Sequence, residues 1–217
     1  MAIARDSSLA NYKGTSSTSS TFSFTNTAGD TMYVGTYAGS STDIVTGVTY
    51  NGVSLTKIAS KQLGTSQWIG IWYLKSPATG ANNIVISASS SADIEGQVIT
   101  YTGGNTTTQP DSFNSSSTSG NITTSTTVVD TGCWLVSNAR SASTGPMNAS
   151  TGVGFTVTGA SAFRMGDSNG TVSTGSQSQT YTGSGNSAMV IASIKPAGGG
   201  GGGATAYPAI LLNYLTI

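Results

Sequence analysis

The sequence predicts an all-β protein, an antiparallel β-sandwich of the jelly-roll or immunoglobulin-like (Ig-like) type. The chain of 217 residues contains 35 Ser, 34 Thr and 29 Gly. Thr favours strands, whereas Ser and Gly favour turns. No stretch of ten or more residues combines helical apolar spacing with a helix-forming composition. Many short apolar runs separated by turn residues indicate packed sheets.

The most apolar internal stretch is residues 66–75, which contains Trp68 and Trp72. Apolar groups stand at both odd and even positions, so we expect a central strand that buries both of its faces. After a connection that contains Pro77 and Gly80, residues 83–87 are expected to form the return strand. We interpret the tryptophans, including Trp134, as core residues and not as a sugar-stacking platform.

The clearest local signal is Asn51-Gly52 between the strand-like runs 45–50 and 53–58, which predicts a type I′ hairpin. Residues 104–120, rich in Ser, Thr and Asn, are predicted to be a long surface connection. Further strands are predicted at 21–25, 31–37, 94–101, 126–130 with 132–137 (as one long strand or two short ones), 154–158, 162–165, 177–182 and 187–194.

Composition divides the chain into four segments. Residues 1–19 are predicted to be an extended N-terminal arm, and residues 20–197 the sandwich domain. Residues 198–206 are a glycine-rich linker, which we expect to act as a flexible tether. Residues 207–217 form an apolar C-terminal attachment segment.

The apolar tail would be an aggregation hazard unless something covers it. We expect it to dock on another subunit, as an added strand or as a short apolar plug. The isolated apolar residues of the arm are expected to contribute to the same attachment. The predicted partner-binding residues are Tyr207, Ile210, Leu211, Leu212, Tyr214, Leu215, Ile217, Ile3, Leu9 and Tyr12.

Charge composition argues against several functional classes. Charged residues make up 7% of the chain and the formal net charge is zero, so no basic stripe is present to bind nucleic acid. The longest apolar run is too short to span a membrane, and the N-terminus lacks the apolar core of a secretory signal.

The residues needed for catalysis are also scarce. The chain has no histidine, a single glutamate and a single cysteine, Cys133, which we interpret as a buried apolar residue. Asp93 and Glu95 are too close along one strand to face each other across a cleft. Asp167-Ser-Asn-Gly170 has one carboxylate and no following Glu, so we interpret it as a turn and not as a calcium loop. We therefore expect no enzymatic activity, no cofactor and no metal.

Several segments together resemble a widespread family of β-sandwich proteins from phage and environmental bacterial genomes. The resemblance spans residues 1–197 and implies a structural role in a virion or on a surface, with no catalytic residues to carry over. The segments that carry it are Met1-Ala-Ile-Ala, Val48-Thr-Tyr-Asn-Gly-Val-Ser-Leu-Thr56, Trp72-Tyr-Leu74, Pro77-Ala-Thr-Gly80, Asn83-Ile-Val-Ile86, Tyr101-Thr-Gly103 and Ile194-Lys-Pro-Ala197.

These observations predict a non-enzymatic virion structural protein of a tailed phage, made in the host cytoplasm and decorating or cementing the capsid. Its partners would be other capsid or tail proteins and copies of itself, with no nucleic acid and no membrane. One alternative is a carbohydrate- or receptor-binding module of a tail fibre or cell surface, with a host-surface glycan as partner. Another is a self-polymerising filament subunit that exchanges its C-terminal strand.

Overall fold

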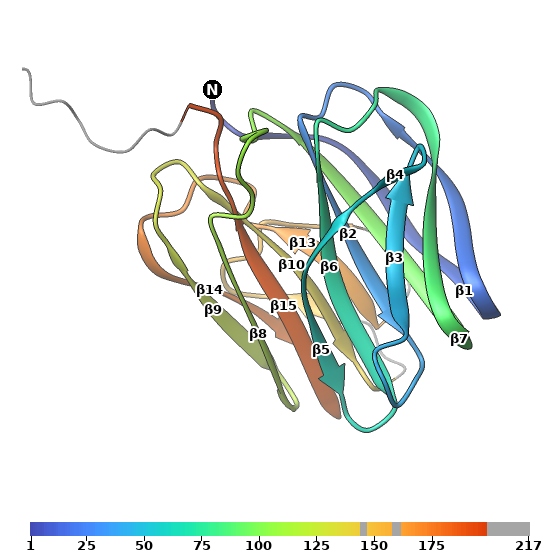
Figure 1. Ribbon diagram of the computed structural model, residues 1–217. Coiled ribbons are helices and arrows are strands. Elements are labelled where there is room, and N and C mark those ends of the chain that lie inside the picture. Colours follow the sequence, from blue (N-terminus) through green and yellow to red (C-terminus); the bar gives the residue numbers. More distant parts are fainter. Residues whose placement is uncertain (144–146, 158–161, 199–217) are drawn as a thin grey trace, which may run out of the picture.

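The computed structural model describes residues 1–143, 147–157 and 162–198. These residues contain strands and no helix, which confirms the all-β prediction. All strand pairs are antiparallel, and the strands form three sheets that pack against one another as a sandwich (Figure 1). We call them the large, middle and outer sheets.

The large sheet has seven strands in the order β4-β3-β7-β2-β6-β5, with β1 paired to the other side of β7. β1 and β7, with 23 residues each, are much longer than the other five strands, and β7 pairs with β1, β2 and β3. Their bounds are β1 Ala4–Asn26, β2 Thr31–Ala38, β3 Val45–Tyr50, β4 Val53–Ser54, β5 Thr56–Leu63, β6 Gln67–Lys75 and β7 Gly80–Thr102.

The large sheet curls over on itself because β7 bends sharply. Ile86 and Gly96 lie ten positions apart on β7, a separation of about 33 Å along a straight strand. Yet a Cβ on Gly96 would lie 2.6 Å from Ile86 Cδ1, so only glycine permits the two halves of the strand to approach. One half of β7 pairs with β3 and the other half with β2. The curl encloses a core that includes Phe22, Tyr50 and Trp72.

The middle sheet has the order β12-β13-β10-β15-β8 and lies between the other two sheets. Both faces of β15 are consequently buried. Val190 and Ala192 face the large sheet, whereas Met189 and Ile191 face the outer sheet. The strands are β8 Ser112–Ser119, β10 Trp134–Ser141, β12 Phe155–Thr156, β13 Phe163–Asp167 and β15 Asn186–Ile194.

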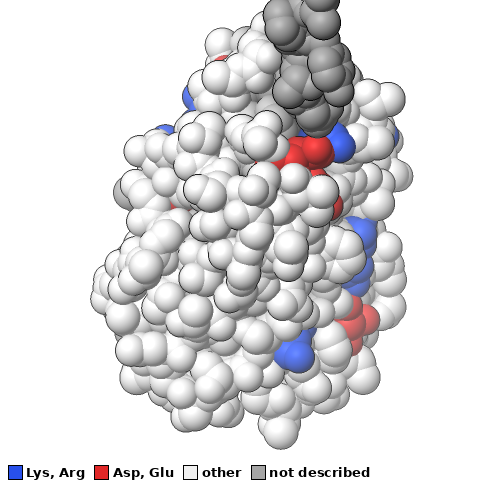
Figure 2. Space-filling model, turned by 90° about the vertical axis from the view of Figure 1, so that its left-hand side faces the viewer, with Lys and Arg blue, Asp and Glu red and all other residues white. Residues whose placement is uncertain are grey.

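The outer sheet is the smallest, with the order β11-β14-β9. Tyr181 and Ile122 point from it into the core shared with the middle sheet. Its strands carry no charged residue, and Figure 2, which faces this side of the molecule, shows charges near one end and along one edge. The strands are β9 Ile122–Val128, β11 Asn148–Ala149 and β14 Gly175–Thr182.

Polar side chains cross between the large and middle sheets. The side-chain amide of Gln97 accepts a hydrogen bond from Met165 N (2.7 Å) and donates one to Phe163 O (3.1 Å). Asn138 Nδ2 donates to Thr36 O at 3.1 Å from the other side of the interface. Such directional contacts fix how the two sheets are placed, which apolar packing alone specifies less strictly.

The Asn51-Gly52 hairpin is confirmed. Both residues have positive φ, 49° and 75°, as a type I′ turn requires. The turn joins β3 and β4, with Tyr50 paired to Val53.

The run 66–75 forms β6, but β6 is not the centre of its sheet. As predicted, it buries both faces: Ile71 lies in the core between the large and middle sheets, and Trp72 in the core within the curl. The prediction that residues 83–87 return beside it is wrong, because β2 lies between β6 and β7. All eight residues of β2 are buried, so β2 and β7 form the true centre.

Two further segments differ from the predictions. Residues 104–120 are not all surface connection, because 112–119 form β8, which pairs with β15 along its whole length. The arm expected at residues 1–19 lies within the sandwich, since residues 4–26 form β1 and pair with β7. In both cases a neighbouring strand supplies the backbone hydrogen-bond partners, and the Ser- and Thr-rich sequence of the segment does not by itself indicate a strand.

Candidate functional site

The predicted attachment residues of the tail, from Tyr207 to Ile217, lie outside the described residues. Of the three expected in the arm, Ile3 is buried in the core between the large and middle sheets, with 4% of its surface exposed. Leu9 is partly buried against the core within the curl. The backbone of Tyr12 pairs with Gly96, and its side chain lies outside what the structure describes. Ile3 is therefore a core residue and is not free to bind a partner.

The start of the chain and the residues that lead into the tail meet at one end of the sandwich (Figure 1). The ammonium group of Met1 donates a hydrogen bond to Ala197 O at 2.9 Å. Ala197 N donates to Gly103 O at 2.7 Å, and Pro196 forms a β-bridge with Gly104. We call this group, with Lys195, Gln109 and Asp130, the terminal cluster.

The side chain of Gln109 binds the backbone of Lys195. Its Oε1 accepts from Lys195 N (2.9 Å) and its Nε2 donates to Lys195 O (2.7 Å). Tyr33 Oη donates to the same Oε1 at 2.8 Å from β2, so the bonds reach the large sheet. The last described residues before the glycine run are therefore fixed in position and direction.

An ion pair adds to this anchoring. Lys195 Nζ lies 2.5 Å from Asp130 Oδ2. The hydrogen bond from Lys195 lowers the pKa of Asp130, and the same bond raises the pKa of Lys195. Both pKa shifts show that the charged forms of Asp130 and Lys195 stabilise each other. Such a partly exposed ion pair contributes modestly to the stability of the protein.

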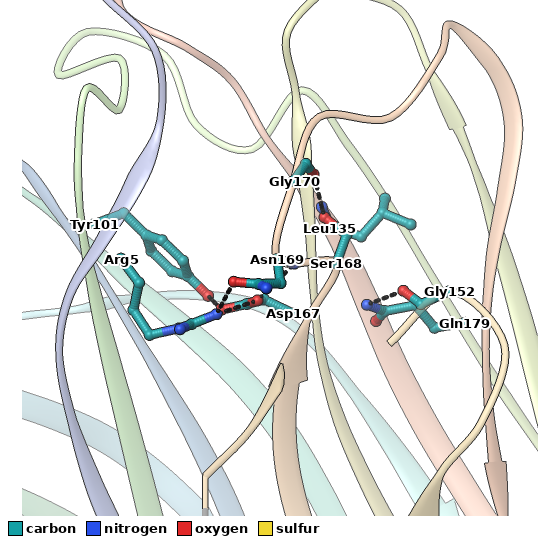
Figure 3. A network of polar contacts seen from close by, with 9 residues as sticks. All are labelled: Arg5, Tyr101, Leu135, Gly152, Asp167, Ser168, Asn169, Gly170 and Gln179. Atoms are coloured by element: carbon teal, nitrogen blue, oxygen red, sulfur yellow. Dashed lines mark hydrogen bonds and ion pairs between the residues drawn. The ribbon is translucent and has the colours of Figure 1, made fainter. Parts of the chain in front are cut away.

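A second polar cluster surrounds the buried carboxylate of Asp167, at the end of β13 (Figure 3). Arg5 on β1 contacts both carboxylate oxygens, Nε to Oδ2 at 2.9 Å and Nη2 to Oδ1 at 2.8 Å. Tyr101 Oη donates to Oδ2 at 3.1 Å, and Asn169 N donates to Oδ1 at 2.8 Å. The guanidinium of Arg5 also stacks on Phe155, 3.5 Å from the ring centroid.

In this arrangement both oxygens of the Asp167 carboxylate accept hydrogen bonds from the protein, which indicates a structural and not a catalytic role. Burial and the neighbouring Asp167 raise the pKa of Tyr101 well above its ordinary value, so its hydroxyl remains a donor. Four hydrogen bonds to Asp167 are what an ionised buried carboxylate needs. The cluster joins the first strand to the middle sheet, and it accounts for the 167–170 segment without a metal ion.

The other candidates from the sequence also have structural surroundings. Glu95 is 3% exposed and its Oε1 lies 3.1 Å from Arg140 Nη1. Cys133 is fully buried, and burial raises its pKa to about 11, so the reactive thiolate is scarce near neutral pH. Within residues 1–143, 147–157 and 162–198, no group of three His, Cys, Asp or Glu side chains is placed to hold a metal ion.

A groove of about 590 Å³ lies between β5, at the edge of the large sheet, and β8, at the edge of the middle sheet. It reaches the first residue of β15, Asn186, whereas the terminal cluster follows the last residue, Ile194. Nine strand residues span about 26 Å, so the groove and the terminal cluster are at opposite ends of the body. Its lining residues are Ser60, Lys61, Gln62, Gly64, Trp68, Ser115, Ser117, Thr118, Asn186 and Ser187.

The sequence interpretation missed this groove, because its residues come from four separate strands and a turn. Trp72 and Trp134 are buried as predicted, with 5% and 8% exposure. Trp68 is only partly buried and lines the groove, which the run 66–75 by itself does not reveal.

No protein-family model matches the chain, and no curated protein is similar to it in sequence. No helix among the described residues is long and apolar enough to cross a membrane.

Proposed function

We propose that this chain is a non-enzymatic structural protein of a virion, which decorates or cements the capsid of a tailed phage. The sandwich is the displayed body, and residues 207–217 attach it to the particle. The observation that carries the proposal is the terminal cluster, in which Met1, Gly103 and Gln109 fix the residues that lead into the tail. A tail that attaches the protein to a particle needs to leave a stable body from residues that are held in place.

The body has what it needs to fold without the tail. Buried apolar residues form a large core between the large and middle sheets, a second within the curl, and two smaller ones beneath the outer sheet. These cores are built from residues between Ile3 and Ile194. In this proposal the apolar side chains of the tail gain about 25 cal/mol for each Å² that they bury on a partner.

The buried carboxylates support a structural role. Glu95 and Asp167 are each paired with an arginine, and both pairs join the large sheet to the middle sheet. The resemblance to phage β-sandwich proteins over residues 1–197 supports the choice of a virion as the particle.

The test is incorporation of the chain into particles made from the phage genome that encodes it. We expect the tagged full-length chain to co-purify with virions through a density gradient. Deletion of residues 204–217 should leave a folded, soluble body that no longer co-purifies. Normal incorporation of the deletion variant would refute attachment by the tail, and absence of the full-length chain from virions would refute the virion role.

A matched pair of variants tests whether attachment depends on the apolar side chains of the tail or only on the length of the tail. Substituting Ser at Leu211, Leu212 and Leu215 keeps the length of the tail but removes its apolar groups, and we expect loss of incorporation. Substituting Ser for five glycines, 199–203, keeps the apolar groups, and we expect incorporation to persist. Size-exclusion chromatography of the pure protein tests the filament alternative, because a filament subunit would assemble without the particle.

A further inference from the structure

We propose that the groove between β5 and β8 binds a short carbohydrate that carries a carboxylate group. The groove combines one unpaired ammonium group with amides and hydroxyls contributed by two sheet edges. This binding site goes beyond the attachment role, and it does not depend on the tail.

The lining of the groove is polar and positively charged. Amides come from Gln62 and Asn186, and hydroxyls from Ser115, Ser117 and Thr118. These groups both donate and accept hydrogen bonds, as the hydroxyls of a sugar do. The lining residues include no carboxylate. Asp43 contacts the lining, because it accepts a hydrogen bond from Ser60 Oγ at 2.7 Å, but Lys57 pairs with it at 2.6 Å and offsets its charge.

Lys61 is the charged group of the groove, and it differs from the other basic residues whose side chains the structure describes. Arg5, Arg140, Lys57 and Lys195 form ion pairs. Lys75 and Arg164 donate to the backbone carbonyls of Thr107 and Met147. Within the described part of the chain, no hydrogen bond or ion pair occupies the Lys61 ammonium, which leaves it available to a ligand carboxylate.

Trp68 provides a second, independent observation. It lines the same groove, and its buried indole Nε1–H has no acceptor among the described residues. A buried donor without a partner is costly, by about 1–3 kcal/mol for such a group. Because that nitrogen is itself shielded from solvent, a ligand in the groove would contact the accessible part of the indole side chain and would reach this donor only after the side chain moves.

The size and the position of the groove also fit a glycan. Its volume of about 590 Å³ lies within the ordinary range for small-molecule sites. It opens at the end of the body away from the terminal cluster, so it remains accessible when the tail is attached to a particle.

The test measures binding of the full-length chain to two matched pairs of probes, 3′-sialyllactose against lactose and tetragalacturonate against neutral galactose oligomers. We expect at least one acidic probe to bind more tightly than its neutral counterpart, by calorimetry or ligand-observed NMR. Lys61→Gln should weaken binding of that probe about tenfold, as loss of a charge-assisted hydrogen bond predicts.

Lys75→Gln is the matched control, because it removes the same charge at a site outside the groove. We expect it to change the affinity less than twofold, and circular dichroism should show both variants folded. Failure of every acidic probe to bind would overturn the proposal, as would equal affinity for the neutral probes or equal effects of the two substitutions. A self-association that Lys61→Gln abolishes, with no saccharide binding, would assign the groove to a second copy and also overturn it. None of these results bears on whether the tail attaches to a virion.

Discussion

At the scale of single residues, two ion pairs show how burial changes the value of a charge. Asp167 has 0% of its side chain exposed and Arg5 21%, and four hydrogen bonds surround the carboxylate. Lys57 and Asp43 form a comparable contact of 2.6 Å, but their side chains are 31% and 22% exposed. Water can replace the exposed contact between Lys57 and Asp43, but it cannot reach the buried contact between Arg5 and Asp167.

Asp167→Asn should therefore destabilise the protein by about 3 kcal/mol, because it leaves the Arg5 guanidinium partly buried without its counter-charge. Asp43→Asn removes the same charge at the exposed pair and should cost less than about 1 kcal/mol. Urea denaturation of both variants measures the difference. Equal losses of unfolding free energy would contradict the structural role assigned to Asp167.

Asp6 gives a pH dependence whose sign follows from its contacts. Burial raises the pKa of Asp6, but hydrogen bonds from Ala28 N, Ser7 Oγ, Thr27 N and Thr100 Oγ1 together lower it below the ordinary value of 3.8. The ionised form is therefore favoured by folding. Its contribution to stability is present above the unfolded pKa and is lost as the pH falls through the lower, folded pKa.

We expect the difference in unfolding free energy between the wild type and Asp6→Asn to be constant above about pH 5 and to shrink below pH 3.8. The comparison cancels the titration of the other carboxylates. Denaturation midpoints measured from neutral pH to about pH 2.5 test it. A difference that persists unchanged at the lowest pH would show that Asp6 is not the titrating group.

At the scale of secondary-structure elements, Gln97 supplies side-chain hydrogen bonds to the backbone of the strand β13. β12 pairs with residues 166 and 167 of β13, and Val157 N adds a bond to Met165 O. Among the described residues, the side chain of Gln97 on β7 is the next group to bond this edge, at Met165 N and Phe163 O. The large sheet thus completes an edge of the middle sheet.

Gln97→Met should cost about 2–4 kcal/mol, since it leaves two buried backbone groups without partners. Gln62→Met, which loses one exposed bond to Ser41 O, should change stability by less than about 0.5 kcal/mol. Hydrogen exchange gives a local readout: the Met165 amide should exchange faster in Gln97→Met. Unchanged protection of that amide would argue against the assigned role.

The β3–β4 hairpin offers a test of backbone conformation without steric interference. A Cβ at Gly52 or at Gly47 would meet nothing within 4 Å, but only Gly52 has a positive φ. Gly52→Ala should cost about 1 kcal/mol from the left-handed conformation alone. Gly47→Ala should be neutral to within about 0.5 kcal/mol. Thermal unfolding of the pair measures this, and equal shifts would mean that the turn relaxes.

At the scale of the whole molecule, the body has two different ends and few charges. The terminal cluster lies at one end and the groove at the other. Eight positive and eight negative residues give a net charge of zero, and the strands of the outer sheet carry none. Attachment through an apolar tail then depends on buried area and not on long-range attraction.

We expect the amount of the chain bound to virions to change less than twofold between about 50 mM and about 500 mM NaCl, because salt screens charges and does not weaken apolar burial. Incubation of stripped particles with the purified chain, followed by sedimentation, measures it. A steep loss of binding with salt would instead indicate attachment by ion pairs.

The sequence identified most strands because burial and turn chemistry act locally. Asn51-Gly52 specifies its own turn, and the run Ala188–Ala192 is apolar at every position because both of its faces are buried. By contrast, 112–119 consists of Ser, Thr, Asn and one Phe, and only the ladder with β15 makes it a strand. The candidate sites were less predictable, because Lys61 and Asn186 become neighbours only when two sheet edges meet.

The sequence alone therefore determined the all-β class, the type I′ turn, the burial of Trp72 and Trp134 and the distinct composition of the tail. Tertiary structure decided which strands are neighbours, that β7 folds back on itself, that Ile3 belongs to the core and that Trp68 lines a groove. The physical reason is that strand propensity and turns depend on adjacent residues, whereas pairing depends on backbone partners far along the chain. Backbone ladders carry little information about which strand is the partner, so the packing of the cores selects the pairing.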